Sequence, residues 1–462
     1  MAALAVSLGM AAVAPARADT LADALVSAYN TSGLLEQNRA LLRAADENVA
    51  QAMSGLRPII SWTGDITRSF ATSASASTFG VARDTAGTST SLGISAQLVV
   101  YDFGQSSIPI EIAKESVLST RYSLIGVEQS VLLRAVNAYM EVIRAQEFLQ
   151  LRQNNVRLIQ QELRAAQDRF EVGEVTRTDV SLAEARLAAA RSGLAVAQGD
   201  LTQAQQEFIA AVGRAPGTLN YPGAAPRLPG SVNAAVSLAL RNHPDMLAAQ
   251  KDVTVAELNV AAADAALKPT VSVTARYGVT ENFNSSAFNR GGSVGLGVSG
   301  PIYAGGRLSS LQRQAMQRRD AARANLHVVS ASVRQNVGNA YASVQVARAG
   351  RGAGDEQVRA ARVAFQGVRE ETTLGARTTL DVLNAEQELL DAQANAISAQ
   401  VDEFVAAYSV LAAMGQLTAQ DLRLAVQIYD PAAYYNMVKT GPAGLSSQGQ
   451  KLDRVLRSLG KD

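Results

Sequence analysis

The sequence contains an internal repeat, and this repeat limits the folds that the chain can adopt. Tyr101, in Val-Tyr-Asp-Phe-Gly, recurs as Tyr303, in Ile-Tyr-Ala-Gly-Gly, 202 positions later. The same offset relates Asn137 to Asn339, Tyr139 to Tyr341, Gly173 to Gly375, Asp179 to Asp381, Glu184 to Glu386 and Gly213 to Gly415. Self-similarity over such a length indicates one structural unit built twice.

Upstream of these matches the offset changes. Pro58 corresponds to Pro269, 211 positions later, so the first copy carries nine additional residues before Tyr101. That interval contains Ala71–Thr78, a run of small and polar residues. Loops tolerate changes in length, so we expect this run to be an exposed loop.

Each copy contains a short segment in which apolar and polar residues alternate. After Pro269, Val271, Val273 and Tyr277 alternate with polar neighbours, and Leu296 belongs to a matching strand downstream. Period-two alternation predicts strands, two in each copy, of about ten residues, enough to cross a bilayer when tilted. Four strands cannot close a barrel, and an open sheet edge cannot lie in lipid. Several subunits must therefore pool their strands, and we expect Val271, Val273, Tyr277 and Leu296 to face lipid.

The long segments between these strands follow heptads. In the first copy alanines recur every seven residues, at 183, 190, 197, 204 and 211, and the second copy repeats them at 385, 392, 399, 406 and 413. A sustained seven-residue period predicts supercoiled helices packed closely at the alanines. The stretch from about 105 to 170, read as one helix, would be about 90 Å long.

Composition removes several classes of function. The 42 Lys and Arg balance the 41 Asp and Glu, which argues against a nucleic-acid partner. No cysteine is present, so a disulfide framework, a thiolate metal site and a lipidated cysteine are excluded. Leu4–Val13 followed by Ala16-Arg17-Ala18 predicts a signal peptide over residues 1–18. No later segment offers about 18 uninterrupted apolar residues.

Two apparent motifs are discounted. Gly295–Gly300 fits the dinucleotide pattern, but its glycines fall on the polar side of a predicted strand and Pro301 follows where a helix should begin. His243 and His327 are far apart, on helical stretches, without a clustered carboxylate set. We therefore expect no cofactor, no metal and no catalytic residue, and hence no enzyme.

The chain resembles the TolC family of outer-membrane factors over roughly residues 21–435. The resemblance is carried by Phe-Glu-Val-Gly ending at Gly173 and leading to Asp179-Val180, by Gly375 leading to Asp381-Val382, and by the Leu-x-Pro before each strand pair. It implies an α+β membrane protein: a homotrimer whose shared 12-stranded transmembrane β-barrel, with four strands per chain, continues into a coiled-coil α-helical tunnel across the periplasm. The implied location is the cell outer membrane.

That resemblance also implies an exit duct that receives substrates from an inner-membrane transporter through a periplasmic adaptor. Ile428–Pro431 with Tyr434 resembles the subgroup that serves type I protein secretion with an ABC transporter. The alternative is a multidrug efflux pump driven by an RND transporter. A structural coiled-coil spacer or adhesin would explain the heptads but not the doubled strand pairs.

The expected organisation follows from the repeat and the resemblance. The segments are a signal peptide (1–18), a first helical region (19–58), barrel hairpin 1 (59–103), tunnel helices of repeat 1 (104–230), a second helical region (231–268), barrel hairpin 2 (269–303), tunnel helices of repeat 2 (304–415), and an equatorial segment with a flexible tail (416–462).

Functional residues are expected at the two helical turns. The adaptor-docking turns are Gly173 with Glu174 and Gly375 with Ala376. The channel gate is assigned to Asp179, Asp381, Arg377 and Thr178: a trimer would gather six carboxylates into a ring, and nearby carboxylates repel one another unless cations or hydrogen bonds intervene. Arg377 is expected to hold the gate closed by bonding to an adjacent helix pair.

Overall fold

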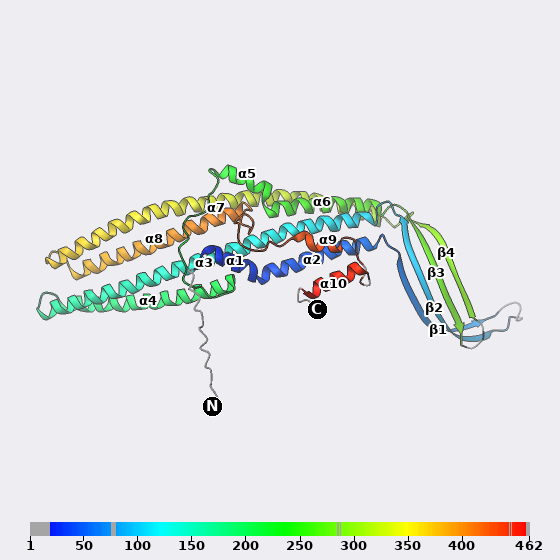
Figure 1. Ribbon diagram of the computed structural model, residues 1–462, viewed down its shortest axis with the longest axis horizontal. Coiled ribbons are helices and arrows are strands. Elements are labelled where there is room, and N and C mark those ends of the chain that lie inside the picture. The colour runs from blue at the N-terminus through cyan, green and yellow to red at the C-terminus, as the bar shows by residue number, and fades with distance from the viewer. Residues whose placement is uncertain are drawn as a thin grey trace, which may run out of the picture. The chain divides into compact units, whose positions relative to one another are not determined.

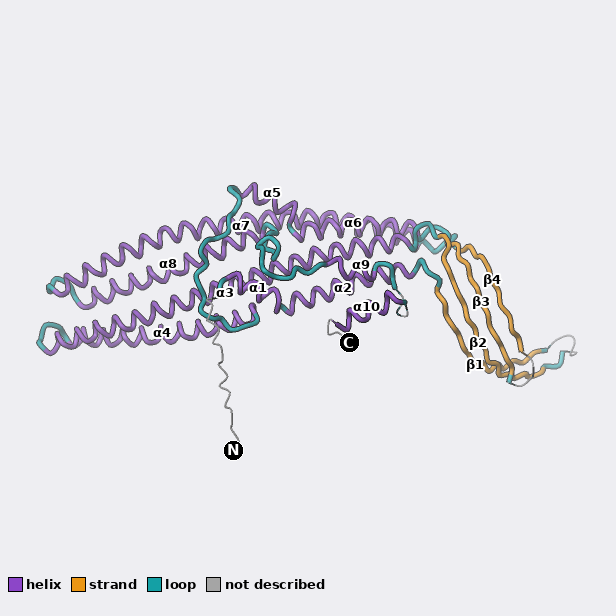
Figure 2. Tube along the Cα trace, in the orientation of Figure 1, coloured by secondary structure: helices purple, strands orange, loops and turns teal. Residues whose placement is uncertain are grey.

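A computed structural model describes residues 19–74, 80–283, 286, 288–442, 444 and 446–458. The predicted signal peptide lies outside the described residues. Within them the chain forms helices and one antiparallel sheet (Figures 1 and 2). The helices are α1 (Leu21–Thr31), α2 (Gly33–Ser54), α3 (Ser107–Glu171), α4 (Arg177–Val212), α5 (Val232–Asn242), α6 (Pro244–Ala265), α7 (Arg307–Thr373), α8 (Thr379–Ala413), α9 (Pro431–Val438) and α10 (Ser447–Ser458). The strands are β1 (Ile59–Ser73), β2 (Arg83–Tyr101), β3 (Thr270–Asn282) and β4 (Phe288–Ser299).

The chain divides into two compact units. The first contains residues 19–38, 123–246 and 329–429, and the second contains residues 39–122, 247–328 and 430–458. The helices α3 and α7 contribute residues to both units. They have 65 and 67 residues, so the single long helix expected from about 105 to 170 is confirmed as α3.

In the first unit, long helices pack in pairs. α3 and α4 share a cluster of buried side chains that includes Val156, Ile159 and Leu187. α7 and α8 are joined by Arg348 and Arg351, which both pair with Glu403. Figure 1 shows the two pairs. The heptad alanines of α4 are buried throughout, as predicted, whereas in α8 only those at 392 and 406 are fully buried.

The start of α1 is fastened to the loop after α4. Tyr139 is fully buried on α3, and its single hydroxyl proton is shared between the carbonyl oxygens of Asp19 (2.8 Å) and Asn220 (2.6 Å). The Asp19 carboxylate accepts from Arg214 at 2.6 Å and from the Gly217 amide at 3.0 Å. The first described residue is therefore held by both its backbone and its side chain.

The second unit contains the sheet, in the order β1-β2-β3-β4. Neighbouring strands are antiparallel, and the register places Trp62 opposite Ile94, Ile94 opposite Tyr277 and Tyr277 opposite Gly292. The strands have 15, 19, 13 and 12 residues, longer than the ten expected. β1 continues to Ser73, so the segment predicted as a loop from residue 71 begins as strand, and residues 75–79 lie outside the described residues.

The C-terminal segment, predicted as an equatorial segment with a flexible tail over residues 416–462, contains two short helices. α9 begins at Pro431 with Asp430 as its N-cap, and Leu452 of α10 is buried against Tyr434 and Val438 of α9. The Tyr434 hydroxyl donates to Glu47 of α2 at 2.6 Å. Up to Ser458 the tail is therefore a pair of short helices, stabilised by apolar burial and by a hydrogen bond to α2.

Two glycines with the same backbone conformation give a matched test of this packing. Gly213 (φ +83°) ends α4, and a Cβ there would lie 2.3 Å from Thr31 Oγ1, whereas Gly173 (φ +80°) has open space around it. Both Gly→Ala changes carry the cost of a left-handed residue, about 1–2 kcal/mol, but only Gly213→Ala adds a steric clash, of about 1–3 kcal/mol. We expect Gly213→Ala to lower the thermal midpoint of the detergent-solubilised protein clearly more than Gly173→Ala. Equal midpoints would contradict this account.

Candidate functional site: the hairpin tips and the sheet

The two turns that connect the long helices have the same backbone structure. At the first, the Glu174 amide donates to the Arg169 carbonyl (2.9 Å) and the Gly173 amide to that of Phe170 (3.0 Å). At the second, 202 positions later, Ala376 and Gly375 donate to Glu371 (2.9 Å) and Thr372 (3.1 Å). These are Schellman motifs, and Gly173 and Gly375 have φ of +80° and +77°, so the prediction that positive-φ glycines end these helices is confirmed.

Each turn is followed by a capping box that holds an aspartate. The Thr176 hydroxyl donates to Asp179 at 2.7 Å, and the Thr378 hydroxyl donates to Asp381 at 2.8 Å. The Thr176 and Thr378 amides donate to the same carboxylates. These bonds lower the pKa of Asp179 and Asp381 below the usual aspartate value, so both are fully ionised at neutral pH.

The capping threonines Thr176 and Thr378, which hold the two aspartates, were not among the predicted site residues. The predicted Thr178 is exposed in the first turn of α4 and corresponds to Leu380 in the second copy. The signal was present, since Thr three residues before Asp, just after a glycine turn, is a capping pattern.

Arg377 lies beside Asp381 and pairs within its own hairpin. Its Nε donates to Glu371 Oε2 at 2.9 Å, which joins the end of α7 to the start of α8 across the turn. Asp381 is close enough to add to the rise in the pKa of Arg377, behind the larger effect of Glu371. Within one chain the cation thus has carboxylate neighbours at the tip.

Each of the two turns carries an exposed apolar side chain. Val172 is 71% exposed and Leu374 is 83% exposed, and each directly precedes the positive-φ glycine. Glu174 and Ala376 are exposed on the other side of the same glycines. Each tip therefore presents an apolar residue, a glycine and an open position in a fixed backbone geometry.

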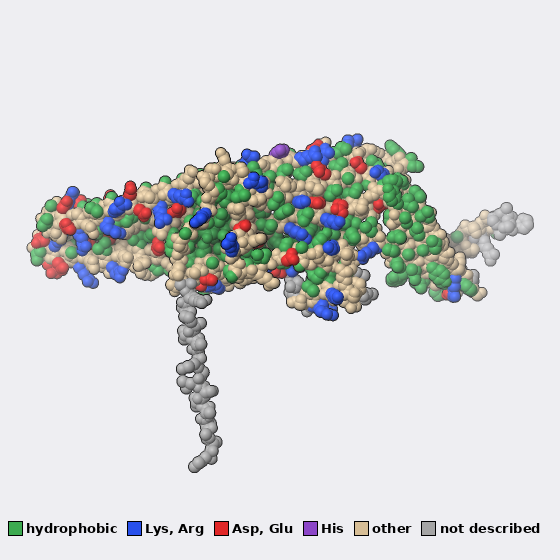
Figure 3. Space-filling view, turned by 45° about the horizontal axis from the view of Figure 1, so that its top comes forward, with side chains coloured by type: hydrophobic (Ala, Val, Ile, Leu, Met, Phe, Trp, Pro, Cys, Tyr) green, Lys and Arg blue, Asp and Glu red, His purple; other side chains and the backbone are tan. Residues whose placement is uncertain are grey.

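The sheet has one apolar face and one polar face. Directly opposed residues on antiparallel strands point to the same side, so Val271, Val273, Tyr277 and Leu296 share a face with Trp62 and Ile94. Figure 3 shows hydrophobic side chains gathered over the strands. The opposite face carries small and polar residues with Asp65, which accepts a hydrogen bond from Ser91 at 2.5 Å, and Arg276.

The discounted nucleotide motif falls on this polar face. Gly295 lies opposite Thr274, and Gly297 lies opposite Ser272. The placement of both glycines on the polar side of a strand is confirmed. His243, expected within a helix, instead caps the end of α5, where its Nδ1 accepts from the Asp245 amide at 3.2 Å.

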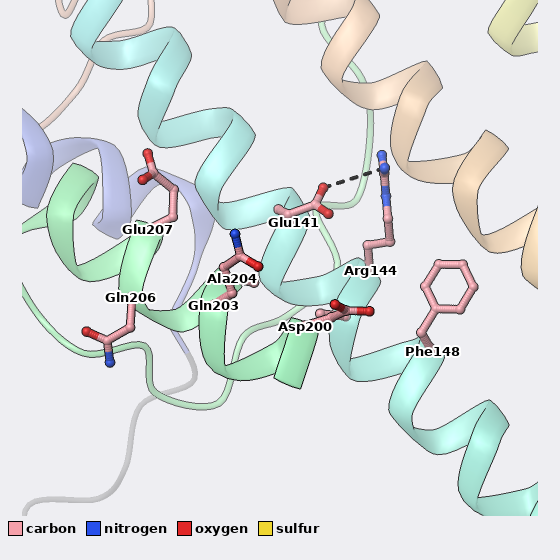
Figure 4. A pocket seen from close by; sticks show the side chains of 9 residues that line it. Glu141, Arg144, Phe148, Asp200, Gln203, Ala204, Gln206 and Glu207 are labelled. Atoms are coloured by element: carbon pink, nitrogen blue, oxygen red, sulfur yellow. Dashed lines mark ion pairs between the residues drawn. The ribbon is translucent and has the colours of Figure 1, made fainter. Parts of the chain in front are cut away.

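A groove of about 630 Å³ lies between α3 and α4 (Figure 4). Its floor includes Ala145 and Ala204, and Glu141, Asp200 and Glu207 lie along it. Arg144 pairs with Glu141 at 3.6 Å and with Asp402 of α8 at 2.5 Å. In the described part of the chain, histidines and carboxylates nowhere form a set that could hold a metal ion. Among the described helices, none has the length and hydropathy needed to span a membrane.

Solved structures place this architecture among outer-membrane channels. The Campylobacter jejuni CmeC outer membrane channel superposes with a TM-score of 0.76 at 15% identity, covering 92% of this chain and 90% of CmeC. The outer membrane protein VceC from Vibrio cholerae gives 0.73 at 21% identity, covering 86% and 96%. The fold of this chain is therefore the fold of these solved outer-membrane channels.

Sequence comparison identifies the family. The family model "Outer membrane efflux protein" matches residues 25–214 and 235–416, and the chain belongs to this family. The outer membrane efflux protein BepC of Brucella suis is 37% identical over 432 residues, covering 93% of this chain and 92% of BepC. The outer membrane protein TolC of Vibrio cholerae is 27% identical, covering 69% and 75%. The alkaline protease secretion protein AprF of Pseudomonas aeruginosa is 27% identical, covering 64% and 63%. The protein is located in the outer membrane and extends into the periplasm.

If the apolar face of the sheet contacts lipid, the protein should tolerate an introduced charged residue on the polar face of β3 but not on the apolar face. We expect Val273→Arg and Leu296→Arg, which alter directly paired residues, to block outer-membrane assembly, because an arginine in lipid costs about 2–4 kcal/mol near the midplane. Ser272→Arg, one residue away on the polar face, is the matched control and should assemble. Membrane fractionation, together with the heat-dependent mobility of the protein on gels, measures assembly. Equal assembly of all three variants would refute the assignment of the lipid-facing side.

Proposed function

We propose that this protein is the exit duct of a tripartite export system, in which three copies form one channel. The observation that carries the proposal is the sheet with two open edges, β1 and β4. Its exposed apolar face suits lipid, but unpaired edge N–H and C=O groups do not. Pairing β4 of one copy with β1 of the next satisfies both edges, and three copies give the 12-stranded barrel.

The helices support the same assembly. The groove between α3 and α4 has an alanine floor and acidic residues along its sides, a shape suited to a helix of a neighbouring copy. In such a trimer the repeated tips bring Asp179 and Asp381 together as six carboxylates. Their capping bonds keep them charged, so the tunnel end is an anionic ring.

Type I protein secretion is the favoured pathway, with an adaptor and an ABC transporter as partners. It is supported by the similarity to AprF, a protease secretion protein, and by the Ile428–Pro431 segment with Tyr434. In this chain the segment begins α9 and ties it to α2. Multidrug efflux with an RND transporter is the alternative, since the family model and BepC are both described by efflux.

The gate is proposed to depend on Arg377 and Asp381. Arg377, beside the turn, would bond to carboxylates or helix ends of an adjacent helix pair in the trimer and hold the tunnel closed. In planar bilayers the purified protein should conduct, Arg377→Ser should conduct more, and Asp381→Ala should lose block by added divalent or trivalent cations. Unchanged conductance and unchanged block in both variants would leave Asp381 as a helix cap and Arg377 as a surface cation only.

The tips are proposed to dock the adaptor through Val172, Leu374 and the flanking positions Glu174 and Ala376. A photo-cross-linking residue at position 174 or 376 should capture the adaptor in cells. When the cross-linker is at one tip, a tryptophan at the other tip (Glu174→Trp or Ala376→Trp) should abolish this capture while leaving trimers intact. The same residue placed at Val196, exposed in the middle of α4, is the control. An adaptor that works with an ABC transporter would support type I secretion, and one that works with an RND pump would favour efflux. Undiminished capture and export in the Trp variants would reduce both turns to plain helix caps.

A further inference from the structure

One carboxylate in the first unit is buried between the two helix pairs. Glu386 of α8 is 3% exposed, and Asn155 of α3 is 7% exposed. The Asn155 Nδ2 donates to Glu386 Oε1 at 2.7 Å. The other oxygen, Oε2, is buried and has no hydrogen-bond partner. A buried carboxylate with a hydrogen bond to only one of its two oxygens is strongly disfavoured in its charged form.

Other polar contacts join the same helix pairs, and in each of them at least one side chain is exposed. Arg186 of α4 donates to Asn384 of α8 at 3.0 Å, Arg369 of α7 pairs with Glu162 of α3 at 3.3 Å, and Arg144 of α3 pairs with Asp402 of α8 at 2.5 Å. Contacts with a solvent-exposed partner contribute little to the association of the helix pairs. On α8, Glu386 lies between the buried Leu383 and Leu390, so it continues an apolar stripe. Among these four contacts, the Asn155–Glu386 bond is the one in which both side chains are buried.

The charged side chains near Glu386 do not compensate for the burial of its carboxylate. The pKa of Glu386 is raised to about 7, and burial is the largest cause of the rise. The hydrogen bond from Asn155 and the charge of Arg186 act to lower this pKa, whereas the charge of Glu162 adds to the rise. Arg369 is engaged by Glu162. Glu386 thus changes charge near neutral pH while it remains in this interface.

We propose that Glu386, held by Asn155, is a proton-sensitive latch between the α3/α4 pair and the α7/α8 pair, which closes when Glu386 is protonated and loosens when it ionises. Separation of the pairs hydrates the carboxylate and returns it to ordinary glutamate behaviour. The separated state therefore binds the proton more weakly. By linkage, the closed state is favoured at acid pH and loses its advantage as pH rises through neutrality.

Within one chain, the carboxylates at the tunnel end are not poised to titrate near neutral pH. Hydrogen bonds from the capping threonines lower the pKa values of Asp179 and Asp381. Burial also raises the pKa of Glu147 on α3, and burial lowers the pKa of His243. A variant of Glu386 itself is therefore needed to assign the effect.

The repeat supplies a matched control. Glu184 of α4 is the counterpart of Glu386, 202 positions earlier, and it is exposed. Glu386→Gln keeps the shape and the acceptor for Asn155 but cannot ionise, and Glu184→Gln makes the same chemical change in water. A latch predicts an altered pH response in the first variant only.

The test measures the separation of the hairpins directly. The chain has no cysteine, so Glu174→Cys with Ala376→Cys accepts spin labels at the two tips alone, and double electron–electron resonance on the purified protein gives their distance distribution. With a closed-state pKa of about 7 against an ordinary 4.5, the ratio of separated to closed states should rise roughly tenfold per chain between pH 6 and pH 8. Glu386→Gln should keep the pH 6 distribution at both pH values, and Glu184→Gln should behave as the parent.

An identical distribution at pH 6 and pH 8 in the labelled parent overturns the latch, even if Glu386→Gln does not assemble. A pH response that survives in Glu386→Gln also overturns it. The latch rests on the proposed channel function, but different results would contradict the latch and the channel. Absence of conductance in the same preparations would count against the channel, while a pH-dependent distance abolished by Glu386→Gln would still establish the latch.

Discussion

Backbone hydrogen bonding at the sheet edges is the constraint on which the proposed assembly depends. β2 and β3 are paired on both sides, whereas β1 and β4 each have one free edge. In water a free edge is tolerated, but lipid offers no partner for its N–H and C=O groups. In the proposed assembly, the apolar face through Trp62, Ile94 and Tyr277 is the face that meets lipid. A single copy is then incomplete, and the trimer we propose completes it.

The hairpin tips depend on local backbone chemistry and on very little packing. A Schellman turn ends one helix and a capping box begins the next, so orphan amides and carbonyls at both helix ends find partners within a few residues. Because the turn supports itself, Val172 and Leu374 are free to remain exposed. A hydrogen-bonded turn with an exposed apolar residue fits the docking role proposed for the tips, since a preformed turn loses little conformational entropy on binding.

Much of this arrangement was readable in the sequence because it rests on short-range rules. Alternation gave the faces of all four strands, the heptads gave the long helices, and Gly173 and Gly375 gave the turns. The strand lengths were underestimated, because pairing with a long neighbour extends β1 into residues that look like loop. The C-terminal helices were missed as packed elements, since they are held by distant partners such as Glu47.

The clearest division lies between Glu184 and Glu386. The sequence by itself determined that the same residue occupies equivalent helical positions in the two copies, since periodicity and offset are local properties of the chain. Only the tertiary structure decided that one carboxylate meets water and the other meets Asn155 in a dry interface. Burial depends on which helix faces which, and residues more than two hundred positions apart set that by packing. A repeat therefore specifies two similar hairpins, while their different surroundings give them different chemistry.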